Sequence, residues 1–388
     1  MTTPSGHSPL GASGASRWMN CPGSVPLSEG IPNESSVYAQ EGTIAHALAA
    51  LCLQTGEDAW MYIGSPLSLF EGHDITGEMA DAVQVYLNSV RDHHEDMNQG
   101  NTWIERSFHC PNIHEMFYGT ADLVHWDADH RELHVWDYKH GAGVVVGPQE
   151  NVQCMYYGCG ALDDLDLWKE AENVVLHIAQ PRAFVAGGPI STWTISASAL
   201  SQWLDNELLP AMDIALVSRE TKTGPWCKFC RVLSHHCPAV AADFDELETM
   251  MTEINKLGGA EKLTNDQLAR YLSLVASAKA AASAAEKTAY ARLKAGNTVP
   301  GYKLVQGRSN RAWKEGADEA LIAKFGDHAY EKVMVSPTKA EKLIDGNEFA
   351  AQWAFKPESK LTLAPDSDKR TAVNVDTKSL FTPIATKE

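Results

Sequence analysis

Long apolar segments are missing from this sequence, which contains no run of eighteen or more hydrophobic residues. A membrane-spanning helix, which needs about 20 such residues, is therefore not expected. The N-terminus also lacks the basic start and the apolar core of a secretory signal. We therefore expect a cytoplasmic protein without a membrane partner. The sequence has no phosphate-binding loop of the form G-x-x-x-x-G-K-S/T, so we expect no ATP motor built on that motif.

Basic residues are scarce, since 32 Lys and Arg stand against 50 Asp and Glu, giving a net charge of −18. This balance argues against a protein that coats nucleic acid non-specifically, because such binding depends on neutralising phosphates with basic side chains. An acidic enzyme can still hold a nucleic acid in a locally basic groove. With 44% hydrophobic and 21% charged residues, the composition is that of a soluble globular protein.

The spacing of apolar residues predicts an α/β protein. Helical spacing occurs at 37–54, 76–97, 149–162, 197–217, 243–257 and 266–294. Strand-like patterns occur at 102–108, 117–126, 132–138, 174–180, around Trp193 and at 301–311. This order predicts a mixed central sheet flanked by helices, followed by a mainly helical C-terminal region. We expect a flexible N-terminus (1–16), a main domain (17–240), the helical region (241–356) and a polar tail (357–388).

Two aspartates and a lysine stand near the ends of two neighbouring predicted strands. Asp122 closes the motif Y-G-T-A-D, and Asp137-Tyr-Lys139 follows fifteen residues later. Residues placed symmetrically about a turn lie opposite one another in an antiparallel pair, so a turn centred near 129–130 puts Asp122 level with Asp137. Lys139 shares a face with Asp137 because side chains alternate along a strand.

This arrangement has the chemistry of a metal-assisted hydrolytic site. Two carboxylates with a backbone carbonyl, here that of Tyr138, form an oxygen site suited to Mg²⁺ or Mn²⁺. A lysine beside them can steady an attacking water or the charge that builds on a phosphate. Taken alone, the pattern also fits two surface aspartates beside a turn. The apolar residues before Asp137 favour an inner strand, and Gly119 permits a close backbone approach beside Asp122.

At these residues the sequence resembles the RecB-like branch of the PD-(D/E)XK nucleases. The family's G-x-x-D, D/E-x-K and Q-x-x-x-Y motifs correspond to segments ending at Asp122, Lys139 and Tyr157. Gln153 and Tyr157 are one helical turn apart and share a face, although an ordinary amphipathic helix would show the same spacing. The resemblance implies a restriction-endonuclease-like core and metal-dependent hydrolysis of DNA, more often as an exonuclease. It also implies that Gln153 and Tyr157 orient the lysine or contact phosphate.

Two further metal ligands are expected from the resemblance. The segment Glu41-Gly-Thr-Ile-Ala-His46 is similar to the helical element whose histidine completes the family's metal site. A lone helical histidine is more often structural, so His46 depends on the resemblance. Glu105, in the strand before Asp122, matches an acidic position of some relatives.

Three cysteines are closely spaced as C-x₂-C-x₆-C, at Cys227, Cys230 and Cys237. In a reducing compartment such a cluster is better interpreted as metal-binding than as part of a disulfide framework. Cys21, within S-R-W-M-N-C-P, is the candidate fourth ligand, and this wording resembles the first-ligand segment of AddB-type and CRISPR-associated RecB-like nucleases. The resemblance implies a [4Fe–4S] cluster with a structural role. Zinc held by the three cysteines and His235 or His236 is the alternative.

The remaining cysteines are interpreted as small buried hydrophobes: Cys52, Cys110, Cys154 and Cys159.

The expected partner is DNA, either single-stranded or with free ends. Candidate phosphate contacts are Lys222, Lys228, Arg231, Lys303, Arg308 and Arg311, although scattered solvated charge would look the same. The layout resembles phage and prophage RecB-like proteins, which implies the cytoplasm of a bacterial host. A separate helicase, a single-strand-annealing protein and a second copy of the chain are further candidate partners. The alternatives in other classes are a catalytically silent DNA-binding or assembly protein and a zinc-stabilised structural protein.

Overall fold

The computed structural model describes residues 8–32, 37–64, 74–94, 101–183, 187–234 and 237–305. The chain divides into two compact units, residues 1–305 and 306–388, and the second lies wholly outside the described residues. The expected boundary near residue 240 lies within the first unit, where residues 265–294 contact residues 225–229 and 231–234 on either side of Cys230. Among the described residues, no helix is long and apolar enough to cross a membrane.

A five-stranded mixed sheet organises the first unit, with strands in the order β1-β2-β3-β4-β5. The strands are β1 (Thr102–His109), β2 (Tyr118–Asp127), β3 (Glu132–Tyr138), β4 (Asn173–Ala179) and β5 (Ile190–Ser196). Only the β3–β4 pair is parallel. A parallel neighbour requires a crossover, and here the crossover contains the helix α5 (Val152–Asp164). The predicted mixed sheet is therefore confirmed, and each strand was expected to within about two residues, the usual uncertainty of such boundaries.

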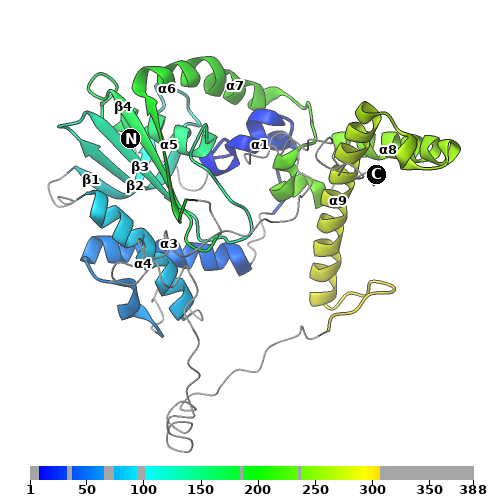
Figure 1. Ribbon diagram of the computed structural model, residues 1–388, viewed down its shortest axis with the longest axis horizontal. Helices are drawn as coiled ribbons and strands as arrows, with labels where there is room; N and C mark the ends of the chain where they lie inside the picture. Colours follow the sequence, from blue (N-terminus) through cyan, green and yellow to red (C-terminus); the bar gives the residue numbers. More distant parts are fainter. Residues whose placement is uncertain are drawn as a thin grey trace, which may run out of the picture. The chain divides into compact units, whose positions relative to one another are not determined.

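Helices cover both faces of the sheet (Figure 1). One face carries α3 (Val37–Thr55) and α4 (Gly77–His93), whose apolar residues pack on Leu123, Trp136 and Tyr138. The other face carries α5, α6 (Ala197–Trp203), the π-helical turn η3 (Leu204–Leu208) and α7 (Leu209–Val217). Burying both faces explains why β4, in the interior of the sheet, is a nearly continuous apolar run.

Close packing of α5 on the sheet depends on glycine. A Cβ atom built on Gly160 would lie 2.2 Å from the ring of Phe108 in β1, well inside van der Waals contact. At Gly119 in β2, a Cβ would meet Phe108 at 3.3 Å and Tyr157 of α5 at 3.7 Å. The glycine before Asp122 therefore lets α5 approach the strand that carries this aspartate.

The N-terminal segment is part of the core and is not flexible over its described part. The expectation of disorder over 1–16 fails for residues 8–16, where Leu10, Ala12 and Ala15 are buried. These residues and Trp18 pack in the same apolar cluster as α5 and α7. The sequence there is rich in Gly and Ser, which suggests flexibility, but its few apolar residues are enough to anchor the segment in the core. The short helices are η1 (Ala12–Gly14), α1 (Ala15–Asn20) and α2 (Ser24–Leu27).

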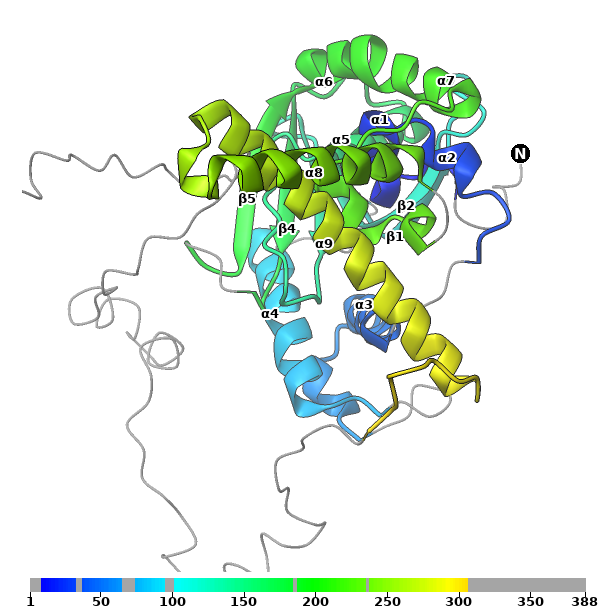
Figure 2. The same cartoon turned by 90° about the vertical axis from the view of Figure 1, so that its right-hand side faces the viewer.

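Two long helices follow the cysteine-bearing segment, α8 (Pro238–Leu257) and α9 (Asn265–Lys294), as predicted (Figure 2). They contact one another, and α9 also contacts η4 (Pro225–Phe229) and η5 (Arg231–Ser234). The remaining short helices are η2 (Ala59–Tyr62) and η6 (Ala260–Lys262). The strand expected at 301–311 is not formed over residues 301–305, where Gly301 adopts φ +82° and no strand partner lies among the described residues.

A group of four histidines lies between the end of α4 and the sheet; we call it the histidine cluster. Its members are His94, His125, His134 and His177. His94 stacks on His125 with ring centres 3.9 Å apart, and the His177 ring stacks on Trp136 at 4.0 Å. Nε2 of His94 accepts a hydrogen bond from Trp136 Nε1 at 3.0 Å, so this ring nitrogen carries no proton. Nδ1 of His134 and Nε2 of His177 are 3.0 Å apart, so one of them is also unprotonated.

Candidate functional site

The two aspartates lie level on adjacent strands, as the sequence predicted. In the β2–β3 ladder Leu123 pairs with Trp136 and Asp127 pairs with Glu132, which centres the turn between residues 129 and 130. One step beyond Leu123 and Trp136, the same register brings Asp122 opposite Asp137. The Asp122 side chain joins the two strands at this end, because its Oδ2 accepts a hydrogen bond from the backbone N–H of Tyr138 at 2.7 Å.

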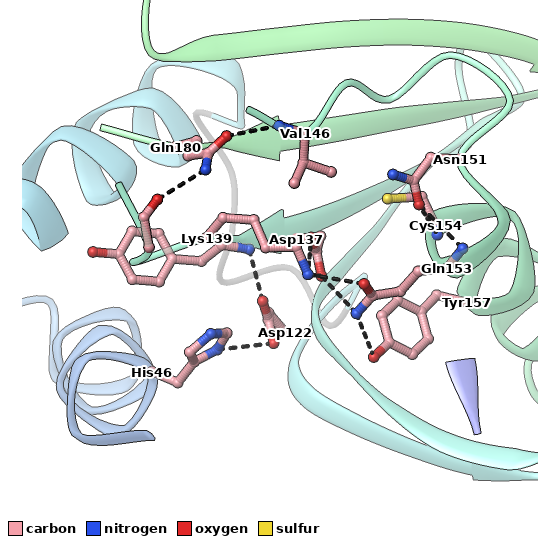
Figure 3. Close-up of polar contacts among 12 residues, drawn as sticks. His46, Asp122, Asp137, Lys139, Val146, Asn151, Gln153, Cys154, Tyr157 and Gln180 are labelled. Carbon is pink, nitrogen blue, oxygen red and sulfur yellow. Dashed lines mark hydrogen bonds and ion pairs between the residues drawn. The ribbon is translucent and has the colours of Figure 1, made fainter. Parts of the chain in front are cut away.

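Lys139 is held between a strand carboxylate and a helix amide (Figure 3). Its Nζ lies 2.8 Å from Asp137 Oδ2 and 3.1 Å from Asp137 Oδ1, and it donates to Gln153 Oε1 at 2.9 Å. Asp137 is only 2% exposed, so this ion pair is largely removed from water. The backbone fixes the start of the lysine, since Lys139 N donates to Ala179 O of β4 at 2.8 Å.

The first turn of α5 supplies the second layer of the site. Asn151 caps the helix by accepting hydrogen bonds from the backbone N–H groups of Gln153 and Cys154, both at 3.1 Å. Gln153 Nε2 then donates to Tyr157 Oη at 3.1 Å and to Asp137 Oδ1 at 3.3 Å. One amide therefore contacts the lysine, the aspartate and the tyrosine, so the predicted Q-x-x-x-Y residues do join the Asp137–Lys139 pair.

His46 and Glu105 approach Asp122 from two other elements. His46, on α3, places Nδ1 3.1 Å from Asp122 Oδ1. Glu105 lies across the β1–β2 ladder from Asp122, since Ile104 pairs with Leu123 and Arg106 with Ala121. Its backbone adopts a left-handed φ of +50° inside a strand, a conformation that costs a non-glycine residue roughly 1–2 kcal/mol. Such strain often persists where the surrounding structure and a functional site require it.

The charges of the site perturb one another. Burial raises the pKa of the Asp137 carboxyl, and although Lys139 lowers it, repulsion from Asp122 adds to the rise. Burial lowers the pKa of Lys139, but attraction from Asp137 outweighs this and leaves the pKa raised, so the ammonium remains charged at neutral pH. Partial desolvation and repulsion from Asp122 raise the pKa of Glu105 to about 7, although the residue as a whole remains exposed.

The pKa of His46 is also raised. Burial alone lowers the pKa of this imidazole, but the negative charge and the hydrogen bond of Asp122 shift it upward by more. The carboxylates around His46 therefore favour a positive charge at this position.

The donors around Asp122 fit a divalent cation. Within the described part of the chain, His46, Glu105 and Asp122 offer one ligand atom each, all within 4.8 Å of one another. Asp137 Oδ2 is buried and pairs with the charge of Lys139 Nζ at 2.8 Å. Among the described residues, it accepts no hydrogen bond. Carboxylate oxygens suit Mg²⁺ and Mn²⁺, and an imidazole in the set shifts the preference toward the transition metal.

The four clustered cysteines also converge. Burial raises the pKa values of the Cys21 and Cys227 thiols, that of Cys227 to about 11, and electrostatic repulsion from Cys230 and Cys237 adds to both shifts. Backbone N–H groups point at two of the sulfur atoms, from Lys222 to Cys21 Sγ and from Gly224 to Cys227 Sγ, both at 3.4 Å. None of the eight cysteines forms a disulfide.

Close chain contact fixes Cys21 beside the other three cysteines. Gly23 N donates to Glu220 O at 2.8 Å, and a Cβ on Gly23 would lie 2.6 Å from that oxygen. His235 and His236, the alternative zinc ligands, lie outside the described residues. The other four cysteines are buried, as predicted.

A family model described as a protein of unknown function (DUF2800) matches residues 7–371. This chain belongs to the DUF2800 family. The matched region includes the aspartates, Lys139 and all four clustered cysteines, so both groups belong to the part of the chain that defines the family. The family description names no activity for the DUF2800 proteins.

Sequence reasoning missed a supporting network around α3. Arg182, just beyond β4, donates to Glu41 of α3 at 2.8 Å and to Glu78 of α4 at 2.9 Å. His140 Nε2 lies 3.4 Å from the same Glu41 oxygen, and Tyr138 Oη lies 2.9 Å from His140 Nδ1. Glu41 opens the segment that ends at His46, so the network fixes the helix that carries this ligand. The order of the strands could have indicated this network. His140 and Arg182 follow two adjacent parallel strands, and the residues after such strands meet at one edge of the sheet.

The predicted basic contacts are not gathered at the aspartates. Lys222 and Lys228 are exposed beside the clustered cysteines, and Arg231 Nη1 donates to Ile31 O at 3.0 Å. Lys303 is exposed beyond α9. Among the described residues, no hydrogen bond or ion pair joins these side chains to the carboxylates of the site. Arg308 and Arg311 lie outside the described residues.

Proposed function

We propose that this DUF2800 protein is a metal-dependent DNA nuclease with a PD-(D/E)XK core, acting on DNA ends as an exonuclease. The proposal depends on the position of Lys139 Nζ. Asp137 and Gln153 hold it at the end of β3, beside the strand end that carries Asp122. Replacing a buried ion pair by apolar residues of similar volume is often neutral or stabilising, so stability alone does not account for this buried lysine. Hydrolysis of a phosphodiester requires this combination of charges.

Each side chain has a role that follows from its contacts. Asp122, Asp137, His46 and Glu105 would hold Mg²⁺ or Mn²⁺, together with the predicted carbonyl of Tyr138. A bound divalent cation neutralises phosphate charge and lowers the pKa of a coordinated water. Lys139 keeps its proton at neutral pH, so it acts as a hydrogen-bond donor to the phosphate or to the attacking water.

Gln153 orients Lys139. The ammonium group has three protons, and its partners among the described residues are Asp137 and Gln153. One donor therefore remains for the substrate. Tyr157, which receives a hydrogen bond from Gln153, keeps the amide turned so that its oxygen faces the lysine. Loss of either α5 residue would leave Lys139 charged but poorly aimed.

We further propose that Cys21, Cys227, Cys230 and Cys237 hold a [4Fe–4S] cluster that joins the N-terminal segment to the end of the sheet domain. Cysteine thiolates hold such clusters, and backbone N–H groups already point at two of the four sulfur atoms. Zinc held by the three later cysteines and His235 or His236 is the alternative.

The nuclease proposal is tested with end-labelled single- and double-stranded DNA in Mg²⁺ or Mn²⁺, using anaerobically purified protein. Lys139→Ala should lower the cleavage rate by about a hundredfold or more, the usual effect of losing one charge-stabilising donor. The matched control is Lys169→Ala, which removes an exposed lysine from the loop before β4, at the opposite end of the sheet. Wild-type rates in Lys139→Ala would refute the assigned role, and inactivity of the wild type on every end structure would favour a DNA-binding protein.

The cluster proposal is tested separately by metal content and visible absorbance. Wild type should contain iron and absorb visible light, and Cys21→Ser should lose both. The control is Cys52→Ala, at a buried cysteine of α3 outside the group. Colourless wild-type protein with one equivalent of zinc would establish the zinc alternative instead.

A further inference from the structure

The loop that follows Lys139 is uncharged and exposes apolar side chains. Residues 141–149 contain no charged side chain, in a chain whose net charge is −18. At its tip Val144 is 44% exposed and Val145 is 57% exposed, whereas Val146 turns inward against the main apolar cluster. Two neighbouring valines thus face solvent within six residues of the lysine.

A buried glutamine holds this loop in place. Gln180, at the end of β4 and only 2% exposed, donates to Gly141 O at 2.8 Å and to Val144 O at 2.7 Å. Its Oε1 accepts from Val146 N at 3.0 Å (Figure 3). All three hydrogen bonds go to backbone atoms of the loop, between Gly141 and Val146. The amide therefore fixes the valines relative to β3 and β4, the two strands whose ends carry Lys139 and its backbone partner.

We propose that Val144 and Val145 form a wedge that contacts the terminal base pair of a DNA duplex and opens it, so that one strand enters the site. This inference rests on the proposed nuclease function. Base pairs present apolar faces, and apolar side chains inserted at a base step unstack it. β-Branched valines suit this use because their χ1 angles are restricted. An uncharged tip also avoids the repulsion that acidic side chains would exert on phosphates.

The size and surroundings of the tip favour a duplex end over other occupants. Two valine side chains are far smaller than the roughly 800 Å² that each partner contributes to a stable protein interface. A membrane-inserting segment needs several basic residues around its apolar side chains, whereas the nearest charged residues along the chain are Lys139 on one side and Glu150 on the other. Val144 and Val145 lie only five and six residues beyond Lys139, which keeps a duplex end bound at the tip near this lysine.

The test uses the full-length protein carrying Val144→Ser and Val145→Ser together. Cleavage of a blunt duplex should fall by about tenfold, the size of a modest change in barrier height, while cleavage of the same sequence as a single strand changes less than about twofold. With 2-aminopurine as the terminal base and EDTA present, the wild type should raise its fluorescence and the double variant should not. Val217→Ser is the matched control, since Val217 is 81% exposed on α7.

The outcomes separate this inference from the nuclease proposal. An unchanged ratio of duplex to single-strand rates overturns the wedge, and so does an equal loss on both substrates, which would assign the loop to the catalytic geometry. A wild-type protein that cleaves single strands but neither cleaves nor unstacks a blunt duplex also overturns it. Absence of all metal-dependent cleavage defeats the nuclease proposal, yet wild-type end opening that is lost in the double variant would still support the wedge.

Discussion

The histidine cluster should make the fold sensitive to mild acid, because its rings must stay neutral to pack. Burial, together with repulsion among the rings, lowers the pKa of His94 to about 3, of His134 to about 4 and of His177 to about 2. In the unfolded chain each imidazole has a pKa near 6.5. Between these values the unfolded state binds protons that the folded state refuses, so stability falls as the pH falls.

The expected loss can be worked out from linkage. Each such histidine removes about 1.4 kcal/mol of unfolding free energy for every pH unit below roughly 6.5, until its folded pKa is reached. Three histidines therefore cost about 4 kcal/mol between pH 7.5 and pH 5.5, with about three quarters of the loss below pH 6.5. A domain is typically stable by only about 5–15 kcal/mol, so this is a large fraction of the total.

Urea unfolding at pH 7.5, 6.5 and 5.5 measures the effect. Glu105, with a pKa of about 7, binds its proton more readily when folded and so acts in the opposite direction. A comparison of variants separates the contribution of the histidine cluster from that of Glu105. His177→Phe keeps an aromatic ring against Trp136 but cannot titrate, so the stability lost between pH 7.5 and 5.5 should shrink by about 1.4 kcal/mol.

The control is His130→Gln, which removes an exposed histidine from the turn between β2 and β3 and should leave the steep acid loss in place. The reasoning is refuted if His177→Phe loses as much stability on acidification as the wild type. It is also refuted if the wild type unfolds at the same urea concentration at all three pH values.

Three further variants test separate features. Glu105→Gly should raise the urea midpoint, because it relieves a left-handed backbone worth roughly 1–2 kcal/mol, while calorimetry should show weaker Mn²⁺ binding; an unchanged Mn²⁺ affinity would exclude Glu105 as a ligand. Gly160→Ala should destabilise the fold by roughly 1–3 kcal/mol in urea, because its Cβ would overlap Phe108, whereas Gly141→Ala has open space around it and should change little. Arg182→Met should weaken Mn²⁺ binding by about tenfold, as supporting residues around a metal site commonly do, and unaltered binding would show that the α3 network does not position the site.

Much of the central unit could be predicted because its information is local. The two-residue period of the strands and one tight turn were enough to put Asp122 level with Asp137, and the three strands around them were located closely. Helical spacing put Gln153 and Tyr157 on one face of α5, and their place in the site was expected from the resemblance to RecB-like nucleases. These inferences needed no knowledge of which elements meet across the chain.

The missed features depend on contacts between distant residues. Burial of Leu10 and Ala12 requires α5 and α7, which lie far along the chain, and the local Gly/Ser composition indicates the opposite. Arg182 reaches Glu41 only because β3 and β4 are parallel neighbours, a pairing that periodicity does not reveal. The left-handed φ of Glu105 likewise has no local cause in its sequence.

The docking of the N-terminal segment has a consequence for biosynthesis. Trp18 is fully buried in the apolar cluster that also contains Met212 of α7, a residue about 190 positions later in the chain. At about 5–20 residues per second, a ribosome takes roughly 10–40 seconds to extend the chain from Trp18 to Met212. During that interval α5, which also packs on the N-terminal segment, can cover only part of its apolar surface. The burial is completed late in folding, when α7 docks and the four cysteines come together.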